Sequence, residues 1–153
     1  MGTTLVATYT KNNHLYWVSV GDSPLLFYRR NTLRRLNADH SYQAVLDAQV
    51  KSGQLSPAAA RQDPRRSQLF SALCGKDVEY VDHQFNPTPL QSGDIIISAS
   101  DGILSLPADD IAALLTDSAD PERIAEDIIA SVINLNRPGQ DNTSVIVQTV
   151  EDA

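Results

Sequence analysis

Short apolar segments separated by turn-forming residues occupy the first third of the chain. Segments 3–10, 15–20 and 25–30 are rich in β-branched and aromatic residues, which favour strands. Asn12-Asn13 separates the first two segments, and the sequence GDSP at 21–24 separates the second from the third. Such residues form tight turns between antiparallel strands. We therefore predict a meander of three antiparallel strands.

The pattern becomes helical between residue 41 and about residue 62. The first helical segment ends at Gly53, and a second opens with Ser56 followed by Pro57. Serine is a preferred N-cap residue, and proline fits the first position of a helix. A pair of helices is predicted here.

The second half of the chain mixes strands and helices. Strands are predicted at 78–85, 94–100 and 143–150, with a short helix at about 109–115 and a longer one that begins at Asp120-Pro121. The longer helix places apolar residues on one face: Ile124, Ile128, Ile129, Val132 and Leu135. We expect one α+β domain, because 153 residues suffice for a single core.

The net charge of −7 is distributed unevenly. Residues 1–76 carry ten basic and four acidic residues, a balance of +6, whereas residues 77–153 carry two basic and fifteen acidic residues, a balance of −13. This balance disfavours nucleic-acid binding and is compatible with cation binding by the acidic half.

The lack of a recognisable membrane span or signal peptide leads us to expect a cytoplasmic protein. The apolar runs are too short to span a membrane, and the N-terminus lacks the basic leader of a signal peptide. Cys74 is the only cysteine, so it has no partner for an internal disulfide. We expect it to be a small buried apolar residue.

Six of the nine arginines form two clusters, one of which contains Arg65 and Arg66. Two interpretations remain open for this pair. The more common one is solvated loop charge, and the other is weak docking of phosphorylated or acidic ligands.

Three aspartates lie beside predicted strand ends. Asp101 follows the strand 94–100, and Asp141 precedes the strand 143–150. If those strands pair antiparallel, the two aspartates share one rim, and Asp22 joins them if strand 15–20 runs in the same direction as strand 94–100. Converging carboxylates repel one another unless a divalent cation lies between them. Ordinary turn chemistry explains each of the three separately, so the pattern alone leaves both interpretations open.

A series of segments in the right order resembles the metal-dependent protein serine/threonine phosphatases of the type-2C class, bacterial branch. The segments are GTTLVA, WVSVGDSPLLFYRR, RLNADHSY, GQLSPAAARQDPRRSQLFSALCG, LQSGDIIISASDGI and GQDNTSVIV. Each is short, but six in order at compatible spacing cover nearly the whole chain.

The resemblance implies a fold and a site. The fold is a layered sandwich of two antiparallel sheets flanked by helices, with Mn²⁺ or Mg²⁺ bound at one sheet rim. Asp101 and Asp141 match metal-ligand aspartates of the family, and Asp22 matches an aspartate associated with a third metal ion. Residues 41–66 match a mobile flap beside the cleft and are called the flap segment below. On this basis Asp101 is a metal ligand, with Gly102 making the turn.

The family pattern is incomplete in this sequence. In family members, GTTLVA follows a segment with a phosphate-binding arginine and with the acidic residue that bridges two metal ions. Nothing before Gly2 provides these residues, the three histidines lie in other contexts, and Pro24 stands where many members have arginine. The chain therefore resembles the C-terminal part of a phosphatase domain, and we expect an N-terminally incomplete fold.

Two functions follow from the resemblance. The first is a phosphatase that hydrolyses phosphoserine and phosphothreonine in proteins with a metal-bound water, inactive or very weak as this chain alone. The alternative is a non-catalytic phosphatase-like module that binds a partner. Because leading strands are missing, an exposed sheet edge or face should remain, and we expect a homodimer through it.

Overall fold

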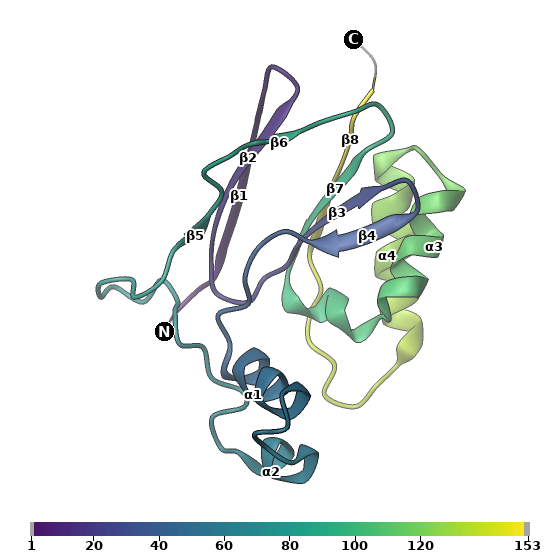
Figure 1. Ribbon diagram of the computed structural model, residues 1–153. Helices are drawn as coiled ribbons and strands as arrows, with labels where there is room; N and C mark the ends of the chain where they lie inside the picture. Colours follow the sequence, from purple (N-terminus) through teal and green to yellow (C-terminus); the bar gives the residue numbers. More distant parts are fainter. Residues whose placement is uncertain (1, 152–153) are drawn as a thin grey trace.

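The computed structural model describes residues 2–151 and contains two antiparallel sheets that pack against each other (Figure 1). The first sheet comprises β1 (Leu5–Lys11), β2 (His14–Val20), β5 (Asp82–His83) and β6 (Thr88–Pro89). The second has the order β4 (Thr32–Arg35), β3 (Leu25–Arg29), β7 (Ile95–Ala99) and β8 (Val145–Thr149). The predicted two-sheet α+β architecture is confirmed.

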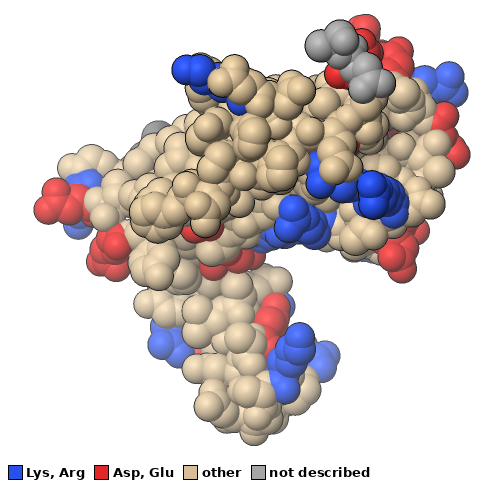
Figure 2. All heavy atoms as spheres, turned by 45° about the horizontal axis from the view of Figure 1, so that its top comes forward, with Lys and Arg blue, Asp and Glu red and all other residues tan. Residues whose placement is uncertain are grey.

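Helices flank this sandwich unequally. A 3₁₀ helix, η1 (Asp101–Ser105), leads into α3 (Ala108–Asp117) and α4 (Pro121–Leu135), which cover the outer face of the second sheet. The flap segment forms α1 (Tyr42–Lys51) and α2 (Pro57–Gln62) and projects away from both sheets (Figure 1). Figure 2 shows this projection with basic and acidic side chains close together on its surface.

Two cores account for the uninterrupted apolar run in β7. Ile95 and Ile97 pack with α3 and α4, whereas Ile96 packs with Trp17 and Phe27 between the sheets. Successive side chains of a strand point to opposite faces. Because both faces of β7 are covered, three consecutive positions are buried, and each is occupied by an apolar isoleucine.

The helices follow their predicted signals. Ser41 and Ser56 cap α1 and α2, and each hydroxyl accepts a hydrogen bond from the backbone N–H three residues later at 3.2 Å. Helix α4 buries Ile124, Ile128 and Val132, with the other two residues of the predicted face half-buried. Among residues 2–151, no helix combines the length and the apolarity that a membrane crossing requires.

The predicted meander is only partly correct. The strands β1 and β2 form a hairpin through Asn12 and Asn13, both at positive φ, as the favoured two-residue hairpin turn requires. However, β2 and β3 do not pair, since they belong to different sheets. Instead β3 pairs with β4 through a turn at Arg30 and Asn31, also at positive φ. The strand β4 was not predicted.

Two further expectations are wrong. Only Asp82–His83 of the predicted strand 78–85 is a strand, because β2 offers pairing partners to these two residues alone. The backbone N–H and C=O of Tyr80 bond instead to the Ser71 hydroxyl, at 3.1 and 2.7 Å. Cys74 is exposed rather than buried.

Candidate metal centre

The pairing of β7 with β8 brings Asp101 and Asp141 to one rim, as predicted. Ala99, the last residue of β7, lies opposite Val145, the first residue of β8. Beyond this pair, Ser100 holds the incoming chain, because its hydroxyl donates to the Asn142 carbonyl at 3.1 Å and accepts from the Ser144 N–H at 3.0 Å. The residues after β7 and before β8 are therefore fixed side by side.

Gly102 was predicted to make a turn after Asp101, but its role at this rim is to allow a close approach of the chain. It is not at positive φ, and Asp101 begins the 3₁₀ helix η1 rather than a simple turn. A Cβ atom on residue 102 would lie 2.7 Å from the Asn142 carbonyl oxygen and would collide with the Thr143 side chain. Glycine is thus required by the close approach of the chain that carries Asp141.

Asp22 reaches the same rim by a different route. The sequence placed it there on the condition that strand 15–20 runs in the same direction as strand 94–100, but β2 and β7 lie in separate sheets. Asp22 instead precedes β3, whose first residue, Leu25, pairs with Ser98 at the end of β7. The Ala99 N–H donates to the Pro24 carbonyl at 3.1 Å, so the start of β3 is tied to the rim.

The three predicted aspartates line one cleft of about 330 Å³. Asp39 also lines it, and the base of the flap segment and the start of the chain after it contribute the facing wall: Ser41, Gln43, Arg66, Ser67 and Leu69. A larger cavity of about 430 Å³ lies at the opposite end of β7. Its buried carboxylate, Asp94, is bound by Arg29 and is not free to take a ligand.

Among the described residues, Asp22, Asp101 and Asp141 have no ion-pair partner, whereas Asp39 pairs with Arg35 at 2.9 Å. Burial raises the pKa of Asp22 most, and the charge of Asp101 raises it further; its own backbone N–H lowers it, and Asp39 and Arg35 have weaker effects in opposite directions. Within residues 2–151, the side chains of Asp22, Asp101 and Asp141 make no ion pair and no hydrogen bond to another residue. Repulsion without a cationic partner is the condition that a bound cation relieves.

These residues fit part of a cation site. Among the described residues, no three histidine, cysteine, aspartate or glutamate side chains form a ready-made metal-binding group. The aspartates are therefore gathered around one cleft but not tightly clustered. Oxygen ligands suit Mg²⁺ and Mn²⁺, and Mg²⁺ sites in proteins commonly keep several waters. The donor set accordingly fits a hydrated cation held by carboxylates.

The two candidate docking arginines have different surroundings. Arg65 forms an ion pair with Asp63 at 2.8 Å, lowers the pKa of that carboxyl to about 2, and lies over the Tyr42 ring. Arg66 lines the cleft, and its only ion pair among the described residues is a long one to Asp47, at 3.4 Å. The structure thus brings Arg66 to the site and leaves Arg65 outside it.

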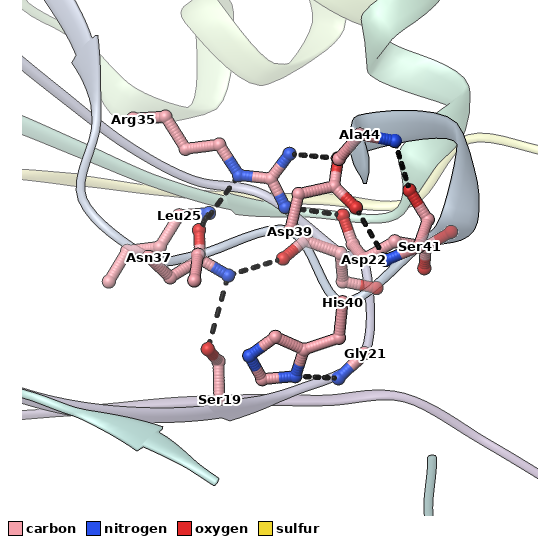
Figure 3. A network of polar contacts seen from close by, with 12 residues as sticks. Ser19, Gly21, Asp22, Leu25, Arg35, Asn37, Asp39, His40, Ser41 and Ala44 are labelled. Atoms are coloured by element: carbon pink, nitrogen blue, oxygen red, sulfur yellow. Dashed lines mark hydrogen bonds and ion pairs between the residues drawn. The ribbon is translucent and has the colours of Figure 1, made fainter. Parts of the chain in front are cut away.

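A polar network beneath Asp22 was missed by the sequence reasoning. It involves Arg35, the last residue of β4, together with Asn37, Asp39 and His40 from the segment between β4 and α1 (Figure 3). No periodicity marks this irregular segment. The only signal was its position inside RLNADHSY, one of the segments that carried the family resemblance.

Comparison with known proteins agrees with this geometry. No family model matches the chain. The serine/threonine phosphatase Stp of Listeria welshimeri is 30% identical over 148 residues, which cover 96% of this chain and 56% of that protein. Over nearly its whole length, the chain is therefore similar to bacterial phosphatases of the type-2C, or PPM, class.

Solved structures support the same assignment. The crystal structure of the Mycobacterium tuberculosis serine/threonine phosphatase PstP/Ppp is 28% identical, with a TM-score of 0.72 over 99% of this chain and 61% of that one. The PstP catalytic domain in complex with two manganese ions is also 28% identical, with a TM-score of 0.69 over 99% of this chain and 60% of that one. The chain therefore spans just over half the length of Stp and about 60% of the solved phosphatase chains, and the matched region is C-terminal, as predicted.

Proposed function

We propose that this chain is part of a metal-dependent protein serine/threonine phosphatase and contributes Asp22, Asp101 and Asp141 to its cation site. The observation that carries the proposal is the convergence of three uncompensated aspartates, from three separate segments, on one cleft. The manganese complex of the similar PstP domain supports metal dependence. Both Mn²⁺ and Mg²⁺ fit an oxygen donor set.

The proposed reaction is hydrolysis of phosphoserine and phosphothreonine monoesters in protein substrates. When bound, the cation would supply Lewis-acid activation of water and neutralise charge on the phosphoryl oxygens. The chain's own carboxylates would hold and orient that cation. Arg66, on the flap side of the cleft, would attract the substrate's phosphate or acidic flanking residues. A cytoplasmic location is part of this proposal and is supported by the single cysteine.

Cation binding is tested by titrating Mn²⁺ into the wild type, Asp101→Asn and Asp141→Asn. Binding is monitored by calorimetry and by paramagnetic line broadening. Loss of one charged ligand should weaken binding roughly tenfold or more, which corresponds to about 1.4 kcal/mol. Asp109→Asn is the matched control, since Asp109 is an exposed carboxylate in the first turn of α3. Equal affinity in the wild type and in Asp101→Asn would show that the cation site is assigned wrongly.

Turnover separates the phosphatase from a non-catalytic module. We found no phosphate-clamping arginine of the family pattern among residues 1–153. Loss of one electrostatic contact to the transition state typically costs about 3 to 4 kcal/mol. The chain alone should therefore hydrolyse an aryl phosphate barely above a Mn²⁺-only control, whereas adding the remaining part of a related phosphatase domain should raise the rate. Strong Mn²⁺-dependent turnover by the chain alone, abolished in Asp141→Asn, would contradict the first expectation.

A further inference from the structure

The backbone on both sides of Asp22 is held by one short segment, residues 35–41, which we call the clamp segment (Figure 3). On the N-terminal side, the Gly21 N–H donates to His40 Nδ1 at 3.1 Å. The Gly21 carbonyl in turn accepts from the His40 N–H at 3.2 Å. His40 is only 1% exposed, so water does not compete for these bonds.

The same segment fixes Asp22 itself and the residues that follow it. The Asp22 carbonyl accepts from Arg35 Nη2 at 2.7 Å. Asn37 donates to the Ser23 carbonyl at 2.9 Å and accepts from the Leu25 N–H at 2.8 Å. Since the Asp22 side chain makes no hydrogen bond to another described residue, these bonds fix the backbone from which its carboxylate projects.

The clamp segment is also attached to the base of the flap segment. Asp39 accepts the Ser41 N–H at 3.0 Å, and Ser41 caps α1. The Phe70 N–H, beyond the flap segment, donates to the His40 carbonyl at 3.0 Å. Arg35 connects the two attachments, because its guanidinium bonds to Asp39 at 2.9 Å and to Asn37 at 3.1 Å.

We propose that the clamp segment couples cation binding at Asp22 to ordering of the flap base, with Arg35 and Asn37 as positioning residues. A displacement of the flap base pulls on Asp39 and His40, and the shift reaches Asp22 through Arg35 and through Gly21. Coupling of this kind is reciprocal, so a cation that fixes Asp22 must also favour the ordered flap base. The inference has two parts. The link to cation binding, called the cation half, rests on the proposed function; the link between the flap base and the backbone around Asp22, called the mechanical half, does not.

The mechanical half is tested without metal by hydrogen exchange of two reporter amides. The Leu25 N–H bonds to Asn37, and the Ser41 N–H bonds to Asp39; Arg35 holds both acceptor side chains. In Arg35→Ala, both amides should exchange about fivefold faster or more. Arg34→Ala is the matched control, because Arg34 lies over the Phe27 ring and does not line the cleft, and it should change neither amide.

A second variant guards against general destabilisation by Arg35→Ala. Asp39→Asn keeps the shape of the side chain and loses the charged bond to Arg35. It should accelerate exchange of the Ser41 and Leu25 amides together, while the urea midpoint changes little. Arg35→Lys, which retains the charge, should restore part of the protection. Faster exchange at only one of the two amides, whether Ser41 or Leu25, would overturn the coupling.

The cation half uses Mn²⁺ or, for the exchange measurement, diamagnetic Mg²⁺ at saturation. In the wild type, the cation should slow exchange at Ser41 and in the first turn of α1. In Arg35→Ala this slowing should disappear at saturating cation, although the cation still binds. Slowing that persists unchanged in Arg35→Ala would overturn the inference. If the wild type binds no cation, the proposed function fails, and the metal-free exchange result still decides the clamp.

Discussion

His40 is a buried histidine whose hydrogen bonding requires its neutral form. Its Nδ1 accepts the Gly21 N–H, so Nδ1 cannot carry a proton, and its Nε2 has no partner among the described residues. The ring packs against Phe70 and Tyr80, with centroids 5.5 and 5.4 Å away. Burial lowers the pKa of His40 below its ordinary value of 6.5, although Asp82 and Asp39 partly oppose this effect.

Acidification should therefore destabilise the protein through His40. The unfolded chain takes up a proton near pH 6.5, whereas the folded chain resists protonation at this site. The unfolded state thus binds more protons, and stability falls as the pH drops below about 6.5, by up to about 1.4 kcal/mol per pH unit. Urea unfolding between about pH 7.5 and pH 5 should show this slope in the wild type.

The control for this prediction comes from the other histidines. His40→Gln should flatten the pH dependence, whereas His83→Gln should keep it, because His83 is exposed. A slope that survives in His40→Gln would assign the effect to carboxylates instead.

At the scale of elements, the flap segment has little core of its own. Helix α1 buries only Leu46, and helix α2 buries only Ala60. By contrast, α3, α4 and the second sheet share one extended apolar cluster. Segments with few buried apolar contacts open locally at a lower free energy than the global unfolding transition. The outer part of the flap should open while the sandwich stays folded.

Leu46→Ala should accordingly unfold the outer flap and leave the sandwich intact. Truncation of a buried leucine costs about 2 to 5 kcal/mol. This cost exceeds the local stability that we expect of a two-helix projection with only two buried side chains. We expect faster proteolysis between α1 and α2 and an unchanged urea midpoint of the sandwich. Ile97→Ala, at a fully buried position of β7, should lower that midpoint instead. Equal global destabilisation by both substitutions would show that the flap is not an independent unit.

For the whole molecule, the two outer faces of the sandwich differ. Helices α3 and α4 cover the second sheet, whereas Figure 1 shows no helix over β1 and β2. The uncovered face carries partly exposed apolar side chains, with Leu5 at 40%, Tyr9 at 62% and Tyr16 at 40% exposure. In addition, β1 is an edge strand of its sheet. Figure 2 also shows a broad surface of the body with few charges.

Self-association through this face or edge is the expected consequence, most simply as a two-fold dimer. Light scattering over a concentration series should show a mass that rises toward the dimer. Tyr9→Lys with Tyr16→Lys should reduce association, since these residues are cross-strand partners on the uncovered face. Phe85→Lys is the control, as this exposed aromatic lies outside β1 and β2. A monomer at high concentration that binds no hydrophobic dye would contradict the prediction.

Local physical chemistry made part of this structure readable from the sequence alone. The caps at Ser41 and Ser56, the apolar face of α4 and the Asn12-Asn13 turn depend on residues within about one helical turn or one hairpin of each other. The rim shared by Asp101 and Asp141 was also predicted, because it required only that two adjacent strands pair antiparallel.

Only the tertiary structure decided which distant segments meet. Turn residues after β2 indicate a reversal, but the packing of β3 into both cores decides that it joins the other sheet. Asp22, just before β3, thereby reaches the rim. The Gly102 requirement arises from Asn142 and Thr143, forty residues away, and therefore has no local signature. Most of the clamp segment has no regular secondary structure and no sequence pattern. Its side chains form hydrogen bonds to the backbone around Asp22 and at the base of the flap segment, not within a helix or between strands. Pairing choice, close approach and polar networks depend on the whole packed chain, and a local pattern does not contain them.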